Sequence, residues 1–152
     1  MNDNILEVIK ISRLIIEEHN MKILSVSKKY NLSFGEADML LIFSNNPNVI
    51  NAKDVVCLSN VSKAYVSKSL NQLVDKKLIT VCVDENDKRK QKVIVNDSAK
   101  DIVKELNKVE NNYLNTLRKN ISKESIDTLI NVFYKVKDNI IEMKGKDYDK
   151  NI

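Results

Sequence analysis

Charged residues are concentrated in one segment near the middle of the chain. Seven of the nine residues from Asp84 to Lys92 are charged, with the acids first and the bases last. Residues 59–100 hold nine bases and five acids, an excess equal to the whole net charge of +4. A local excess of positive charge is typical of a surface that binds a polyanion, although a merely solvated charged face has the same composition.

A second group of polar side chains precedes this segment at helical spacing. Val66, Leu70 and Leu73 recur every three to four residues, which predicts the buried face of a helix from Lys63 to about Lys76. The opposite face carries short hydroxyls, an amide and lysines, which are suited to base edges and phosphates in a major groove. This predicted contact face consists of Ser62, Lys63, Tyr65, Ser67, Lys68 and Asn71.

The elements that position these residues are expected to be mostly helical, because the chain has only two Gly and one Pro. Apolar periodicity predicts helices over about residues 4–29, 34–45, 52–58 and 63–76. Alternating residues at 79–83 and 93–95 then predict a β-hairpin with the charged segment at its tip. Two more helices follow, from Ser98 through Leu117 and from Ser122 through Ile141. The predicted fold class is mainly α with a small β-hairpin wing, a winged helix-turn-helix flanked by N- and C-terminal dimerisation helices.

Polar residues at the starts of these helices predict how each helix is capped. Asn4 with Glu7, and Ser33 with Glu36, have the spacing of a capping box. The remaining helices are expected to take their N-caps from the side chains of Asn51, Ser62, Ser98 and Ser122.

The first helix and the last two carry more apolar surface than a small monomer needs. We therefore expect residues 1–31 and 98–144 to form dimerisation helices, residues 32–97 to form the winged lobe, and residues 145–152 to be a flexible tail. An all-helical monomer core is the alternative. A two-fold dimer would place two recognition helices about one turn of DNA apart. The expected interface residues are Leu6, Ile9, Ile126, Leu129, Ile130 and Phe133.

From about residue 4 to 143, the chain resembles the MarR family of dimeric bacterial transcription regulators. SFGEADMLLIFSNNP, residues 33–47, resembles the second helix of the family, and DVVCLSNVSKAYVSKSLNQLVDKKLI, residues 54–79, resembles its helix-turn-helix. DENDKRKQKVIVND, residues 84–97, resembles the wing, whose usual pattern is D-x-R followed by a strand. Two positions depart from the family, since Lys77 and Ala99 stand where Gly is common.

The resemblance implies sequence-specific binding to double-stranded DNA without a cofactor. By this resemblance Arg89 enters the minor groove, whose negative potential attracts arginine, and Asp87 orients its guanidinium. Lys88 and Lys90 would lie against phosphates. It also implies a cytoplasmic homodimeric repressor on a palindromic operator, released by a small aromatic or amphipathic effector. The effector contacts are expected at His19, Tyr30, Phe34 and Tyr113.

The residues support other kinds of chemistry poorly. The chain has no nucleophile elbow, phosphate-binding glycine loop or H-E-x-x-H motif, and has one histidine, so neither an enzyme nor a metal site is expected. No apolar run approaches the roughly 20 residues that span a bilayer. Cys57 is expected to be buried and Cys82 exposed, with redox sensing a minor alternative. A winged helix used only for protein–protein contact is the alternative function, and it would bind DNA weakly and independently of salt.

Overall fold

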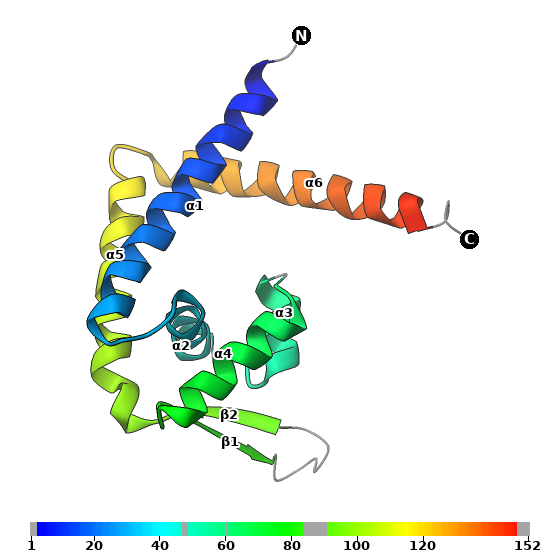
Figure 1. Cartoon of the computed structure of the whole chain (residues 1–152). Coiled ribbons are helices and arrows are strands. Elements are labelled where there is room, and N and C mark those ends of the chain that lie inside the picture. Colours follow the sequence, from blue (N-terminus) through cyan, green and yellow to red (C-terminus); the bar gives the residue numbers. More distant parts are fainter. Residues whose placement is uncertain (1–2, 47–48, 60, 84–90, 149–152) are drawn as a thin grey trace. The chain divides into compact units, whose positions relative to one another are not determined.

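The computed structural model describes residues 3–46, 49–59, 61–83 and 91–148 (Figure 1). The mainly helical fold with a two-stranded wing confirms the predicted fold class. The chain divides into two compact units, residues 1–113 and residues 114–152. In order, the elements are α1 (Asp3–Lys29), α2 (Phe34–Asn45), α3 (Ala52–Ser59), α4 (Lys63–Asp75), β1 (Ile79–Val83), β2 (Gln91–Val95), a short 3-10 turn (Asp97–Ala99), α5 (Lys100–Leu117) and α6 (Lys123–Tyr148).

Local hydrogen bonds confirm most of the predicted helix starts. The Ser33 hydroxyl accepts from the Glu36 amide at 3.3 Å, and the Glu36 carboxylate accepts from the Ser33 amide at 2.6 Å, so the capping box is closed. Asn51 caps α3 by accepting two backbone amides at 2.9 and 3.1 Å. The hydroxyls of Ser62 and Ser122 each accept an amide hydrogen at 3.1 Å at the starts of α4 and α6.

Three predicted features at helix ends are wrong or shifted. Asn4 lies inside α1, because the helix already includes Asp3. Ser98 lies inside the 3-10 turn, two residues before α5 begins at Lys100, and its hydroxyl donates to the Lys77 carbonyl at 2.7 Å. The last helix continues to Tyr148, so the first four residues of the expected flexible tail are helical.

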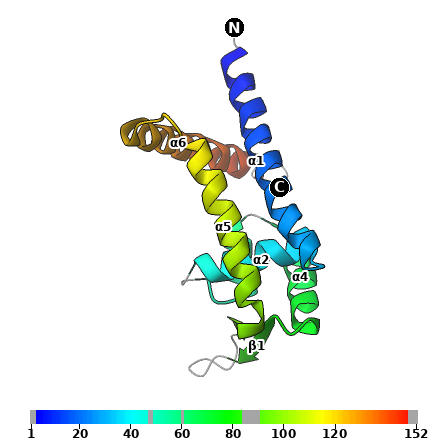
Figure 2. The same ribbon diagram turned by 90° about the vertical axis from the view of Figure 1, so that its left-hand side faces the viewer.

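The core of the first unit lies where α2 meets its neighbours. α2 packs against α1, α4 and β2, while α3 packs against α4. α1 and the first part of α5 run side by side (Figure 2). The buried apolar residues are Ile23, Val26, Leu32, Ala37, Met39, Leu40, Leu41, Val55, Val66, Leu70, Leu73, Leu78, Ile79, Val93, Ala99, Ile102 and Leu106.

Polar contacts join α1 to α5 in an antiparallel register. Near the C-terminus of α1, the Glu105 carboxylate accepts from Lys29 at 2.6 Å and from the Tyr30 hydroxyl at 2.7 Å. Further along α5, the Tyr113 hydroxyl donates to the Ile15 carbonyl at 2.7 Å. These contacts fix the position of α5 on α1 within residues 1–113.

α4 ends in a Schellman motif that requires a left-handed residue at Lys77. The Lys77 amide donates to the Val74 carbonyl at 2.8 Å, and the Leu78 amide donates to the Leu73 carbonyl at 2.9 Å. Lys77 has a φ of 58°, so the helix ends as it would with Gly, although a side chain makes that backbone less favourable. Asn31 has a φ of 53° just after α1, in a conformation that Asn tolerates well.

The wing is tied to the helix-turn-helix through its second strand. β1 and β2 are antiparallel, and the Val93 amide donates to the carbonyl of Ile50, just before α3, at 2.8 Å. Cys82 is half-buried, contrary to the prediction that it is exposed, while its neighbours Val81 and Val83 are 37% and 57% exposed. The reason is that the core covers only the first residue of β1, so its later residues lie beyond the core.

Cys57 is exposed, contrary to the prediction that it is buried. α3 is only eight residues long and buries a single residue, Val55, so the apolar side chains two and three positions further on face away from the core. Among the described residues, no helix combines the length and the apolar content needed to cross a bilayer.

Candidate nucleic-acid interface

α4 presents a polar face to solvent because its apolar residues are used in packing. Val66, Leu70 and Leu73 are 0%, 7% and 0% exposed, which fixes the rotation of the helix about its axis. Five of the six predicted contact residues of this segment therefore lie on one open surface. They are Ser62, Lys63, Ser67, Lys68 and Asn71.

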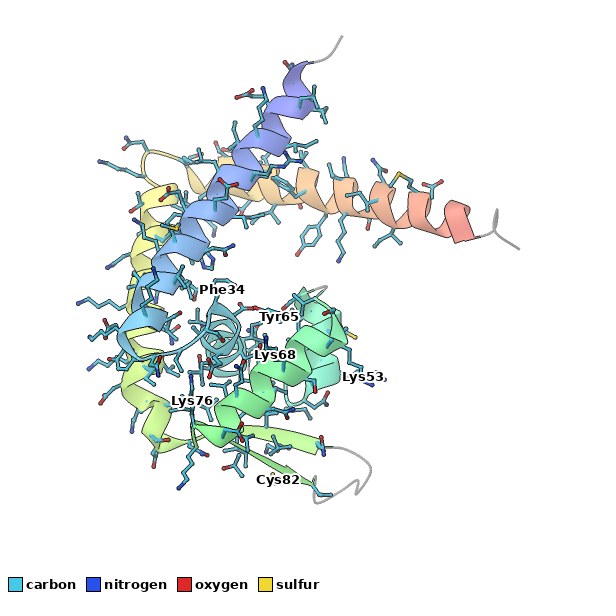
Figure 3. The ribbon with its side chains drawn as sticks, viewed as in Figure 1. Phe34, Lys53, Tyr65, Lys68, Lys76 and Cys82 are labelled. Carbon is cyan, nitrogen blue, oxygen red and sulfur yellow. The ribbon has the colours of Figure 1, made fainter. Side chains whose placement is uncertain are left out.

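Tyr65, the sixth residue, is turned toward α2. Its hydroxyl donates to the Asp38 carboxylate at 3.4 Å, and its side chain is partly buried against the core (Figure 3). Burial, reinforced by the Asp38 carboxylate, raises the pKa of Tyr65 to about 12, so the phenol is a neutral hydrogen-bond donor at physiological pH. The structure thus separates Tyr65 from the other five and gives it a partner inside the fold.

Gly35 sets how closely α2 approaches α4. A Cβ atom at this position would lie 2.5 Å from the Ser69 hydroxyl oxygen, closer than real Cβ contacts. Ser69 is buried, and its hydroxyl is directed to the Tyr65 carbonyl at 2.9 Å. Sequence analysis missed Gly35, although a glycine in the first turn of a helix, in a chain with two glycines, is a usable signal.

Lysines on α3 and α4 form an un-neutralised positive surface. Lys53, Lys63 and Lys68 form none of the ion pairs found among the described residues. Figure 3 labels Lys53 on α3 and Lys68 on α4. The neighbouring acid, Asp54, accepts the backbone amides of Ile50 and of the next residue at 2.9 and 3.1 Å, so its charge is used at the start of α3. Such lysines are suited to phosphate contacts. Sequence analysis also missed Lys53, which the structure places on the same lobe as α4.

Lys76, in contrast, is used to hold the end of α4. Its ammonium lies 2.7 Å from Glu36 Oε1 and donates to the Asn31 carbonyl at 2.6 Å. Glu36 is only 1% exposed. Burial raises the pKa of Glu36, but Lys76 and the hydrogen bonds with Ser33 outweigh it, so that pKa lies below its ordinary value. The carboxylate therefore stays charged and ties α4 to the ends of α1 and α2.

The predicted wing-tip contacts lie outside the described residues, so their roles stay predictions. They are Asp87, Lys88, Arg89 and Lys90. The strands on either side are described, and Gln91 and Lys92 at the start of β2 are exposed. Because β2 is bonded to the segment before α3, the base of the wing has a fixed position beside the helix-turn-helix.

The predicted effector residues are not brought together. His19 and Tyr113 lie beside each other, with ring centroids 5.7 Å apart, whereas Tyr30 is bonded to Glu105. Phe34 lines a separate open groove of about 500 Å³ along α1. The other lining residues of this groove are Glu17, Glu18, Asn20, Met21 and Leu24.

The predicted interface residues lie on two helices that expose apolar side chains. On α1, Leu6 and Ile9 are 57% and 43% exposed. On α6, in the other unit, Ile126 is partly buried and the remaining three predicted residues are 45–54% exposed. Those three residues are Leu129, Ile130 and Phe133.

Comparisons with known proteins agree with this arrangement. Residues 30–90, which include α2, the helix-turn-helix and β1, match the model of the MarR family. A MarR family transcriptional regulator from Listeria monocytogenes, solved with a 26mer DNA, is 19% identical and has a TM-score of 0.73, over 93% of this chain and 91% of that one. The S. aureus MepR–DNA complex is 18% identical with a TM-score of 0.73, over 86% of this chain and 94% of that one.

A third solved structure extends the likeness to nearly full length. The MarR/EmrR family transcriptional regulator from Acinetobacter sp. ADP1 is 15% identical with a TM-score of 0.74, over 93% of this chain and 99% of that one. At these identities the solved structures show the fold, while the family model covers the segment that carries the candidate interface. Residues 30–90 are therefore similar in sequence to the MarR family, and the chain as a whole has the fold of solved MarR family transcriptional regulators.

Proposed function

We propose that this regulator binds a specific double-stranded DNA sequence through α4 and the wing. The observation that carries the proposal is the open face of α4, where hydroxyl, amide and lysine side chains lie together on a helix fixed by its buried residues. Hydroxyl and amide groups can bond to base edges, and the lysines can contact phosphates. Two of the similar proteins were solved with DNA, which supports the same activity here.

The wing is proposed to contribute through its tip. Arg89 would enter the minor groove with Asp87 orienting it, and Lys88 and Lys90 would contact phosphates. The bond between Val93 and Ile50 supports this role, because it holds the base of the wing beside the recognition helix.

The acting species is proposed to be a cytoplasmic homodimer on a palindromic site. The exposed apolar residues of α1 and α6 support this, because apolar stripes of this size are normally covered by a partner. Two-fold symmetry would present two copies of α4 to successive major grooves.

The first experiment measures the affinity of the purified protein for DNA upstream of its own coding sequence, over a salt series. Several phosphate contacts predict a steep log–log dependence on salt and a preference over scrambled DNA. Lys68→Ala should reduce the salt slope by about 1, because one phosphate contact is lost. Arg89→Ala should lower affinity most where the site has an A·T-rich minor groove.

Lys22→Ala is the matched control for these variants, since Lys22 is exposed on α1, outside α4 and the wing. It should leave both affinity and salt slope unchanged. Weak binding that is flat in salt and indifferent to Arg89 and Lys68 would reject DNA recognition. The winged helix would then serve protein–protein contact.

We further propose that the dimer is a repressor released by a small aromatic or amphipathic ligand. The open apolar groove beside Phe34 supports the presence of a ligand site in the first unit. A ligand that binds better to a dimer with wrongly spaced recognition helices would shift the population away from DNA. Titrating candidate ligands into the protein–DNA complex tests this. A true effector should release the DNA over the same range of concentrations in which it binds the free protein.

A further inference from the structure

Tyr65 and Asp38 form a polar contact at the base of the candidate interface. The phenol comes from the first turn of α4 and the carboxylate from α2. Their 3.4 Å separation exceeds the usual distance of about 2.5–3.0 Å for a hydroxyl donor, so a small movement of α4 can strengthen or break the bond. Gly35 allows this close approach, since a Cβ there would lie 3.2 Å from the Tyr65 hydroxyl.

Asp38 also faces charged groups on two other helices. Burial is the largest influence and raises the pKa of Asp38. The Tyr65 hydrogen bond and the charge of His19 lower it, and the charge of Glu110 raises it. Asp38 therefore interacts with α4 through Tyr65, with α1 through His19 and with α5 through Glu110.

Glu110 is itself held from two sides. One carboxylate oxygen lies 3.5 Å from His19 Nε2, and the other accepts from the Asn45 side-chain amide at 3.1 Å. Asn45 follows Asp38 by seven residues and so lies on the same face of α2. His19 packs on Tyr113, whose hydroxyl is bonded to α1. These contacts connect the paired helices α1 and α5 to Asp38 and then to the recognition helix.

We propose that Asp38 is a positioning residue for DNA recognition, holding the first turn of α4 through Tyr65, and that Glu110 makes this hold depend on the packing of α1 against α5. The proposal deepens the proposed function and rests on it. A shift of α5 on α1 would move the Glu110 charge relative to Asp38. In a partly buried site such a change is weakly screened, so it alters the hydrogen bond that orients Tyr65.

Four variants test the link between Asp38 and Tyr65. Asp38→Ala removes the acceptor, Tyr65→Phe removes the donor, the double variant removes both, and Asp38→Asn keeps an acceptor. Each single deletion should lower affinity for the specific fragment by about ten-fold, and the double variant should lose no more than either single one. Asp38→Asn should stay within about two-fold of the wild type. Affinity for scrambled DNA should be unchanged, because the lysines of α4 are intact.

Three results would overturn the proposal. Additive losses in the double variant would mean that the two groups act independently. A loss in Tyr65→Phe without one in Asp38→Ala would place the phenol on DNA directly. A loss in Asp38→Asn equal to that in Asp38→Ala, matched by an equal fall in thermal stability, would mean a structural role only.

A readout without DNA separates this proposal from the proposed function. Hydrogen exchange at the Tyr65 and Val66 amides reports on the first turn of α4, where the Ser62 hydroxyl and carbonyl accept them. Exchange there should speed up several-fold in Asp38→Ala. It should slow in Glu110→Gln, which removes the charge that repels the Asp38 carboxylate. Asp101→Asn is the matched control, because it neutralises an exposed carboxylate in the first turn of the same helix. Unchanged exchange in Glu110→Gln overturns the coupling, whereas specific DNA binding failing in the wild type overturns only the proposed function.

Discussion

α4 and α6 both carry an apolar stripe, but only α4 buries it. Val66 and Leu73 of α4 are 0% exposed, whereas Ile130 and Phe133 of α6 are 46% and 45% exposed. Leaving apolar area in water costs roughly 25 cal/mol per Å², so a stripe of this length favours a partner. In the described residues, α4 finds its partners in its own unit and α6 does not.

This difference separates two roles that look alike in the sequence. A repeat of apolar residues every three to four positions predicts a buried face, but it does not say whether the covering surface belongs to the same chain. Within residues 1–113 α4 is covered by α2, α3 and the wing, and the face left open is polar. On α6 the apolar side chains are themselves exposed, and this is the observation behind the proposal that α6 takes part in dimerisation.

The largest expected effect comes from placing a charge on the α6 stripe. Phe133→Asp should weaken the homodimer by more than about 100-fold, because each interface would bury two unpaired carboxylates. Sedimentation equilibrium measures the change. The monomer should also lose most of its affinity for a palindromic site, since one recognition helix would then bind alone.

Lys135→Asp is the control for that variant. It lies two residues further along α6, about 200° away around the helix, so it places the same carboxylate on the opposite face. It should leave the dimer intact. A dimer that survives Phe133→Asp would show that the exposed stripe of α6 is not the interface.

An intermediate effect is expected from breaking the ion pair beneath α4. Lys76→Met should destabilise the fold by about 2–3 kcal/mol, because Glu36 is left as a buried carboxylate whose Oε1 loses the ammonium. Urea unfolding measures the difference. Adding Glu36→Gln should recover part of it, since the amide oxygen can still accept from the Ser33 amide and no buried charge remains.

The same pair should give stability a defined pH dependence. Burial raises the pKa of Glu36, but Lys76 and Ser33 together lower it by more than burial raises it. The pKa in the folded state therefore lies below the unfolded value. The contribution of the Glu36–Lys76 pair to the free energy of unfolding is therefore fully present above the unfolded pKa of Glu36. It is lost as the pH falls through the folded pKa. The gap in unfolding free energy between wild type and Lys76→Met should be widest near neutral pH and should close as the pH falls through the folded pKa of Glu36. A gap that widens on acidification would contradict this assignment.

Features that depend on neighbouring residues were predictable from the sequence. The Ser33 capping box, the Asn51 and Ser62 caps and the burial of Val66, Leu70 and Leu73 all follow from spacing along one segment, and the structure confirms them. The exposed face of α4 follows from the same spacing. The wing pattern and the order of the helices added the resemblance to the MarR family, which local signals alone would not supply, and residues 30–90 match the model of that family.

Features that depend on distant residues were not predictable. Ser98 has the residue type of a cap, but its hydroxyl is bonded to Lys77, 21 positions earlier. Tyr65 has the spacing of the contact face, but it meets Asp38 of α2. Cys57 has the composition of a core residue, but α3 is too short to bury it. In each case packing against another element decides the outcome, and periodicity carries no information about that element.

The smallest expected effect concerns Lys77, where this chain keeps a side chain at a left-handed helix end. Lys77→Gly should stabilise the fold by about 1 kcal/mol, because Gly adopts a φ of 58° without steric cost. Lys77→Ala retains the Cβ and should gain little, so the difference between the two variants in thermal unfolding isolates the backbone term. Asn31→Gly, at a φ of 53°, should gain less than Lys77→Gly, since Asn already tolerates this region. Equal gains at both positions, or a gain from Ala equal to that from Gly, would mean that the strain is not at Lys77. A confirmed gain would show that the lobe retains its packed core and polar face despite an unfavourable residue at the junction between α4 and the wing.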